Sequence, residues 1–269
     1  MQMTNEELEN KTARLQALLH SYGKVAVAYS GGVDSSLLLR MACDSLGPEQ
    51  VLALHAVSCL SSEADQEKAA KAVSSPNGGG CSYRAIELTP LRWPEFVANT
   101  AQRCYFCKKR MYDALLTELT QETHVLLDGT NSDDLQTDRP GLAAIREFSI
   151  HTPLALAKLT KLDIRTLARR RGLANWDQPS NSCLATRIPQ PQKITAILLR
   201  QVMNAEHFLH QKGFTACRVK LGNDAITIEL PSHDLKKMAG DSTTFKLGEY
   251  LQQLGLTQLP LNLRARDHF

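Results

Sequence analysis

The stretch VAVAYSGGVDSS at residues 25–36 constrains the fold of this chain more than any other. A run of apolar, β-forming residues leads into Ser30, Gly31 and Gly32, and a helical apolar run follows from Leu37. This pattern predicts a strand, a glycine turn and a helix. Glycines let backbone N–H groups close on an anion, and the N-terminus of the following helix adds partial positive charge. We therefore expect the turn to bind phosphate.

Side chains in the same stretch add donors for phosphate and a ligand for a metal. Ser30, Ser35 and Ser36 carry hydroxyl groups, and Asp34 could hold Mg²⁺ beside a phosphate. The chain contains neither a Walker G-x-x-x-x-G-K-[ST] motif nor a dinucleotide-binding G-x-G-x-x-G motif. SGGVDS instead resembles the PP-loop of ATP pyrophosphatases, which split ATP between the α and β phosphates and adenylate a substrate oxygen. The alternative is a plain glycine turn in an α/β domain.

The segments that follow predict a parallel α/β sheet of the Rossmann-like PP-loop class. Further strands are expected at residues 51–57, 83–88 and 124–128. Helices are expected at residues 5–20, 62–73, 103–122 and 160–171. Alternation of strands and helices favours parallel strands with right-handed crossovers, whose ligands collect at the carboxyl ends. Ser58 and Gly129 follow two of these strands, so we expect both near the adenosine.

A segment rich in Pro, Ser and Gln at residues 177–192 separates this region from a different pattern. A small α+β domain is predicted beyond it, with helices at residues 194–211, 234–238 and 244–254, strands at 216–221 and 225–230, and a short last strand. We expect residues 1–190 to form the PP-loop ATP pyrophosphatase domain. Residues 191–269 would then form a smaller domain for substrate binding or oligomerisation.

Composition limits the class of protein. A net charge of +3 is too small to indicate a nucleic-acid-binding protein. No apolar run approaches the length of a membrane span, and the opening MQMTNEELEN is too polar for a signal peptide. Seven cysteines, an odd number, without a secretion signal favour a reducing cytoplasm over a disulfide framework.

Two thiols in RCYFCK, those of Cys104 and Cys107, lie three residues apart at the expected start of a helix. Side chains at this spacing face the same side and could share a metal ion or form a disulfide. The motif alone leaves four alternatives: a redox pair, half of a zinc site, part of an iron–sulfur site, or chance. The cysteines outside the motifs, which we expect to be small buried or semi-buried residues, are Cys43, Cys59, Cys81 and Cys217.

The order of motifs along the chain resembles the LarE family, the sulfur transferases of nickel-pincer cofactor synthesis. The motifs are SGGVDS, RCYFCK, DGTNSDD, DRPGL, SCLATR and a late RVK…IEL. The resemblance implies that ATP adenylates a carboxylate of a pyridinium-3,5-biscarboxylate mononucleotide and releases pyrophosphate. Sulfur then displaces AMP and leaves a thiocarboxylate. Some members give up the sulfur of their own cysteine, and others hold a [4Fe-4S] cluster that carries an extra sulfide.

The resemblance also assigns residues to the ATP and sulfur sites. Cys104, Cys107 and Cys183 match the three-cysteine pattern, and three thiolates would leave one iron of a cluster open. Lys108 would contact the phosphates or the adenylate. The residues that would hold pyrophosphate and Mg²⁺ are Ser30, Gly31, Gly32, Asp34 and Ser35.

A second group of charged residues is assigned to the mononucleotide. Arg187 would lie on the side of the substrate phosphate, and Arg218 and Lys220 would receive that phosphate. Glu206 and Glu229 would orient the two cations. The alternative for each is an ordinary surface charge. The family usually has an aromatic residue between the Asp and the Arg of the DRPGL motif. Here Asp138 is followed directly by Arg139, so the role of Asp138 stays open.

Three other functions remain compatible with the sequence. One is a different PP-loop enzyme that amidates its substrate or thiolates tRNA, although the lack of a broad basic patch argues against tRNA. Another is an enzyme in which the three cysteines bind a purely structural zinc. The third is a non-catalytic adenine-nucleotide sensor. The resemblance further implies a small-molecule substrate, a sulfide or other sulfur donor, no membrane, and a hexamer as the homo-oligomer.

Overall fold

The computed structural model describes residues 5–121, 123–136, 140–179, 182–239, 243–256 and 260–266. Backbone contacts divide the chain into two compact units. The first unit contains Met1–Ser58, Glu63–Leu88 and Gln102–Gln178. The second contains Cys59–Ser62, Thr89–Ala101 and Pro179–Phe269, so it takes two short segments from the earlier part of the chain. A domain boundary near residue 190 remains a prediction.

The first unit is built on a four-stranded sheet in the order β3-β2-β1-β4. The strands are β1 (Val25–Ala28), β2 (Val51–Val57), β3 (Ser82–Glu87) and β4 (Val125–Asp128). All three pairings are parallel, and Val25 lies opposite both Val51 and Val125. The predicted parallel α/β class is confirmed. Because the strands are parallel, the loops that follow β1 and β4 lie at the same edge of the sheet.

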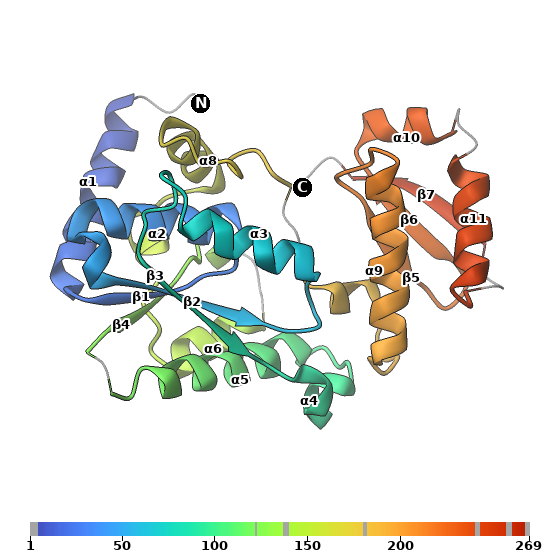
Figure 1. The fold of residues 1–269 in the computed structure, drawn as a ribbon, viewed down its shortest axis with the longest axis horizontal. Helices are drawn as coiled ribbons and strands as arrows, with labels where there is room; N and C mark the ends of the chain where they lie inside the picture. The colour runs from blue at the N-terminus through green and yellow to red at the C-terminus, as the bar shows by residue number, and fades with distance from the viewer. Residues whose placement is uncertain are drawn as a thin grey trace. The chain divides into compact units, whose positions relative to one another are not determined.

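Helices cover both faces of this sheet (Figure 1). One face carries α1 (Asn5–Tyr22), α2 (Val33–Leu46), α3 (Glu63–Val73), α7 (Pro153–Leu156) and α8 (Lys161–Arg170). The other carries α5 (Arg103–Glu118) and α6 (Gly141–Glu147). Val25 and Val27 of β1 join the first core, whereas Ala26 joins the second. Burial on both faces explains why the strands are nearly continuous apolar runs.

The second unit contains a three-stranded sheet in the order β5-β6-β7. Its strands are β5 (Arg218–Leu221), β6 (Ile226–Leu230) and β7 (Leu261–Ala265), with β5 and β6 antiparallel and β6 and β7 parallel. Its helices are α4 (Pro94–Val97), α9 (Ala196–Gln211), α10 (Ser232–Ala239) and α11 (Thr243–Gln253). The expected small C-terminal α+β arrangement is therefore present.

Local signals in the sequence predicted most of the long elements. The helix expected at residues 160–171 begins with a capping box, since the Asp163 N–H donates to Thr160 Oγ1 and the Thr160 N–H donates to Asp163 Oδ2. The short helices α4, α6 and α7 were not predicted. They span only four, seven and four residues, too few for an apolar period to show. In the described part of the chain, no helix is both long and apolar enough to cross a membrane.

Candidate active site

The turn between β1 and α2 contains two glycines with different structural needs. Gly31 has a φ of +75°, and a Cβ there would lie 2.8 Å from the Cβ of Ala69 on α3. Gly32 is the N-cap of α2 with an ordinary φ of −73°, and the nearest atom to a Cβ there would be Ser30 Oγ at 3.4 Å. The fold therefore requires glycine at position 31, whereas the open space beside Gly32 is available to a ligand.

Serine hydroxyl groups stabilise this turn through hydrogen bonds within it. Ser35 Oγ donates to the Gly32 carbonyl at 3.1 Å and accepts from the Ser30 N–H at 3.2 Å. The hydroxyl oxygens of Ser30 and Ser35 lie 3.1 Å apart. The first N–H groups of a helix have no acceptor within the helix. The start of α2 therefore offers backbone donors to an anion bound in the turn.

Asp34, the expected magnesium ligand, lies in the first turn of α2 and has a partner on each carboxylate oxygen. Oδ1 accepts from Asn131 Nδ2 at 3.1 Å, and Oδ2 forms an ion pair with Lys161 Nζ. Asn131 lies in the loop after β4, where its Oδ1 accepts from the N–H of Asp133 at 2.9 Å. A carboxylate is a ligand that Mg²⁺ prefers, but both oxygens of Asp34 face nitrogen donors in this structure, so its role as a magnesium ligand stays a prediction. Lys161 was missed in the sequence, although the capping box marked it as the first residue of α8.

The two residues expected near the adenosine lie after β2 and β4. A Cβ at Gly129 would lie 3.0 Å from the Ser35 backbone nitrogen, so Gly129 allows the loop after β4 to pack against the start of α2. The Ser58 carbonyl accepts from Gln66 Nε2 at 2.9 Å. Contact of Ser58 and Gly129 with adenosine stays a prediction.

Lys108 is held at the end of β4 by Asp128. Its Nζ lies 3.5 Å from Asp128 Oδ2, which also accepts from Tyr112 Oη at 2.7 Å. Thr130 donates to Asp128 Oδ1 through its N–H, at 2.8 Å, and through its hydroxyl. Burial alone would raise the pKa of Asp128, but the Lys108 charge and these hydrogen bonds outweigh it, so the pKa lies below its usual value. Asp128 is therefore ionised at neutral pH and fixes the position of the Lys108 ammonium group.

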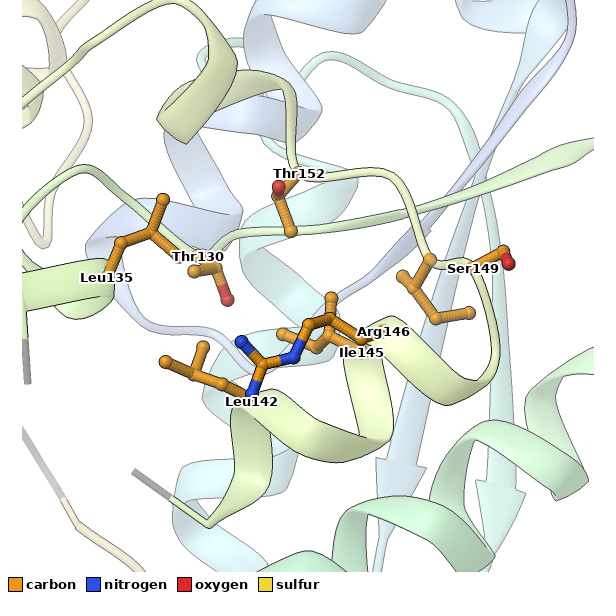
Figure 2. A pocket seen from close by; sticks show the side chains of 8 residues that line it. Thr130, Leu135, Leu142, Ile145, Arg146, Ser149 and Thr152 are labelled. Atoms are coloured by element: carbon orange, nitrogen blue, oxygen red, sulfur yellow. The ribbon is translucent and has the colours of Figure 1, made fainter. Parts of the chain in front are cut away.

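A cavity of about 290 Å³ adjoins the loop after β4 (Figure 2). Its walls come from that loop, from α6 and from the turn before α7, and its lining residues are Thr130, Leu135, Leu142, Ile145, Arg146, Ser149, Ile150 and Thr152. Figure 2 shows the Arg146 side chain lying along α6 beside Leu142. The cavity thus combines apolar walls with one cation. Asp138, whose role the sequence left open, lies outside the described residues.

The cysteines of the three-cysteine pattern do not form disulfides. Cys104 and Cys107 are the second and fifth residues of α5, and Cys104 is exposed and accepts from Arg103 Nη2 at 3.8 Å. Cys183 is also exposed and belongs to the second unit. Among the residues that the structure describes, no three His, Cys, Asp or Glu side chains are grouped so that they could hold a metal ion. An iron–sulfur cluster on these thiols therefore stays a prediction.

The remaining cysteines were expected to be buried or semi-buried. This is confirmed for Cys43, Cys81 and Cys217. Burial raises the pKa of the Cys217 thiol well above its usual range, which makes it a poor nucleophile. The expectation was wrong for Cys59, which is exposed because it lies in the turn after β2, outside both cores of the sheet.

In the second unit, Arg187 is fully enclosed rather than presented at a surface. Its side chain is 1% exposed and forms an ion pair with Glu206, with Nε 2.8 Å from Oε1. Its Nη1 donates to the Ser182 carbonyl at 2.8 Å, and the N–H of Val219 donates to Glu206 Oε1 at 2.9 Å. The Arg187–Glu206 pair therefore holds the loop that contains Cys183 in place against α9 and β5.

A second charged cluster surrounds Glu229 on β6. Lys220 Nζ lies 2.7 Å from Glu229 Oε1, and Arg266 Nη1 lies 3.6 Å from Oε2. Arg218 is buried on β5 directly opposite Glu229 in the strand register. Burial and the nearby charge of Arg187 lower the pKa of Arg266. Lys220 and Arg266 thus both approach one carboxylate, and cationic side chains gathered in this way are suited to binding an anionic ligand. No pattern in the sequence marks Arg266, which follows the last strand.

With this geometry described, comparison with known proteins shows the family. The family model for NAD synthase matches residues 7–92, which include the PP-loop turn. The pyridinium-3,5-bisthiocarboxylic acid mononucleotide synthase of Lactiplantibacillus plantarum is 34% identical over 259 residues, covering 95% of this chain and 91% of that protein. The chain belongs to the LarE family. It is therefore an enzyme, a sulfur transferase with a PP-loop that binds ATP.

Two further relatives match over long stretches. An uncharacterized protein of Synechocystis sp. is 32% identical over 259 residues, covering 96% of this chain and 95% of that protein. An uncharacterized protein of Methanocaldococcus jannaschii is 31% identical over 219 residues, or 81% of each chain. Membership of the LarE family removes the alternative of a non-catalytic nucleotide sensor.

The buried ion pair in this LarE-family enzyme gives a prediction about stability. Arg187→Ala should lower the free energy of unfolding of the second unit by about 3–5 kcal/mol, because Glu206 would stay buried without its partner. Urea denaturation can be followed by the fluorescence of Trp93, which lies in that unit, in a background in which Trp176 of the first unit is replaced by Phe. The exposed Arg264 offers a control, and Arg264→Ala should change stability by less than about 0.5 kcal/mol. Equal effects of the two substitutions would contradict the role of the pair.

Proposed function

We propose that this enzyme uses ATP to adenylate a carboxylate of pyridinium-3,5-biscarboxylic acid mononucleotide and then replaces AMP by sulfur, forming a thiocarboxylate. The observation that carries the proposal is the PP-loop turn at the start of α2, in a chain that aligns over nearly its whole length with the named synthase. A carboxylate oxygen would attack the α-phosphorus, and the bond from that phosphorus to the bridging oxygen would break. Pyrophosphate would leave, and the backbone N–H groups of the turn would bind it.

The first unit would bind ATP through backbone donors and two charged side chains. The N–H groups of the turn and of the first turn of α2 would bind the β and γ phosphates. Asp34 would hold Mg²⁺, which neutralises charge on the departing pyrophosphate when it is bound. Lys161, which pairs with Asp34 in this structure, would instead pair with a phosphate oxygen when Asp34 coordinates Mg²⁺. Lys108, fixed by Asp128, would face the adenylate.

Sulfur delivery would depend on Cys104, Cys107 and Cys183. None of the three is in a disulfide, Cys104 and Cys183 are exposed, and Cys107 is half-buried, so a cluster could reach their sulfur atoms. Thiolates are the usual ligands of a [4Fe-4S] cluster, and three of them leave one iron open to carry a sulfide. The acyl carbon of the adenylate would form a bond to sulfur, and its bond to the AMP oxygen would break. Arg187 would act indirectly, by holding the loop that contains Cys183.

The cluster of cations around Glu229 would bind the mononucleotide phosphate. Arg218→Ala or Lys220→Ala should each weaken binding of the mononucleotide by about 1.5–3 kcal/mol, the contribution of a charge-assisted hydrogen bond. Binding of ATP should not change. Calorimetric titration of both ligands tests this, with Lys236→Ala as a control because Lys236 is an exposed lysine of α10 in the same unit. An equal loss of affinity for both ligands would mean that the two cations only support the fold.

The reaction itself can be tested by its product. The enzyme should be purified without oxygen and incubated with ATP, Mg²⁺, the biscarboxylate mononucleotide and sulfide, and the pyridinium product should be examined by mass spectrometry. The expected product has one carboxylate oxygen replaced by sulfur. An amide product, or sulfur transfer to tRNA but not to the mononucleotide, would assign the enzyme to a different substrate class.

A further inference from the structure

We propose that Asn175 is a positioning residue for polyphosphate binding, because it fixes the orientation of the Gly31–Gly32 peptide. Asn175 lies in the connection after α8 and is half-buried. Its Nδ2 donates to the Gly31 carbonyl oxygen at 2.8 Å and to Ser36 Oγ at 2.9 Å. One amide group thus contacts both the turn and the first helical turn of α2.

The bond to Gly31 decides which way the next N–H points. The Gly31 carbonyl and the Gly32 N–H belong to one planar peptide, and in a trans peptide the two groups point in opposite directions. Asn175 holds the carbonyl on its own side, so the N–H faces the opposite side. There the Gly32 N–H donates a long hydrogen bond, 3.4 Å, to Ser30 Oγ, another group expected to bind phosphate. The N–H is therefore aimed into the turn before any phosphate arrives.

Glycine makes this external restraint necessary. Gly31 has a φ of +75°, and two consecutive glycines give a backbone that can adopt many other conformations. Without Asn175, the peptide between them could rotate and turn its carbonyl oxygen toward the phosphate. A carbonyl dipole in that position would repel the anion that the N–H is meant to bind.

Asn175 is itself held in place by its neighbours. Leu173 is buried in the first core, and the N–H of Trp176 donates to the Leu173 carbonyl at 3.2 Å. The Arg169 guanidinium lies 4.8 Å from the centre of the Trp176 ring, a distance suited to a cation–π contact. The connection after α8 is thereby fixed on both sides of Asn175, so the amide can act as a rigid support for the turn.

The inference rests on the proposed binding of pyrophosphate by the PP-loop, and it predicts a selective loss of affinity. In the full-length enzyme, Asn175→Ala and Asn175→Asp should weaken binding of inorganic pyrophosphate and of ATP by about tenfold, as expected for the loss of one well-placed hydrogen bond. Affinity for AMP, which lacks the β and γ phosphates, should be unchanged. Asn175→Asp is nearly the same size but places a carboxylate against the Gly31 carbonyl, so its effect should be at least as large.

Asn77 provides the matched control. Its Nδ2 donates to the Gly172 carbonyl at 2.9 Å, so it is also an asparagine amide bound to a glycine of the connection after α8. Asn77→Ala should leave pyrophosphate and ATP affinity unchanged, whatever it does to the melting temperature. Calorimetric titrations with the three ligands, and a thermal melt of each variant, give the comparison.

Each outcome decides a different question. If the unaltered enzyme binds neither pyrophosphate nor ATP, the proposed function fails. If it binds both, and the Asn175 variants bind them equally well, the inference is overturned while the proposed function stands. A parallel loss of pyrophosphate, ATP and AMP affinity together with a lower melting temperature would mean that Asn175 is only structural, which also overturns the inference.

Discussion

Gly32→Val should give a folded protein that binds neither ATP nor pyrophosphate. The φ of Gly32 is −73°, which any residue can adopt, and the nearest atom to an added Cβ is Ser30 Oγ at 3.4 Å. The valine branches would instead occupy the space where phosphate oxygens approach the backbone donors. We expect affinity for ATP to fall more than about 100-fold, since several hydrogen bonds to charged groups are lost together. Titration calorimetry and a thermal melt measure the two effects separately.

The neighbouring glycine serves as the control for this prediction. Gly31→Ala would require an alanine at a φ of +75° and a Cβ 2.8 Å from that of Ala69. The left-handed backbone alone costs about 1–2 kcal/mol, so this variant should melt at a lower temperature than Gly32→Val. A folded Gly32→Val variant with unchanged affinity for ATP would contradict binding of phosphate by the turn.

Replacing Cys104, Cys107 or Cys183 by Ala should abolish sulfur transfer while ATP-dependent release of pyrophosphate continues. The phosphate-binding turn lies between β1 and α2 and contains none of these cysteines. Protein purified without oxygen should be brown and contain about four irons per chain, as a [4Fe-4S] cluster requires. Each of the three substitutions should remove that iron. The measurements are the iron content, the absorption spectrum, the rate of pyrophosphate release and the rate of sulfur transfer.

Cys59 is the matched control for the three cysteines, because its thiol is also exposed. Cys59→Ala should keep both the iron and the sulfur transfer. Anaerobic reconstitution that yields no iron while stoichiometric zinc stays bound would contradict the cluster and favour a structural metal. A single turnover that consumes Cys183 once per chain, with no metal at all, would indicate instead that the enzyme gives up its own sulfur.

The fold could be predicted well because its signals are local. The apolar strand before Ser30, the glycines of the turn and the capping box at Thr160 each act within a few residues along the chain. Alternation of strands and helices then implied the parallel sheet. Short elements such as α6 were missed because seven residues form less than two helical turns and show no clear apolar period.

The site could be predicted only in part, because its contacts join segments that are distant in sequence. Gly31 and Asn175, whose hydrogen bond holds the turn, are 144 positions apart in the sequence, and Asp34 and Lys161 are 127 positions apart. No local pattern marks Asn175 as the partner of Gly31, or Lys161 as the partner of Asp34. Arg187 was assigned to the substrate phosphate, and only the structure reveals that Glu206 encloses its guanidinium.

The central claim is that the enzyme activates a carboxylate by splitting ATP between its α and β phosphates. The measurement is to incubate the full-length enzyme with ATP and Mg²⁺, with and without the biscarboxylate mononucleotide, and to quantify the nucleotides and phosphates by chromatography and phosphorus NMR. We predict that pyrophosphate appears only when the mononucleotide is present, in an amount equal to the AMP recovered as the acyl adenylate and as free AMP together. Formation of ADP and inorganic phosphate, or of AMP at the same rate without the mononucleotide, would contradict this account.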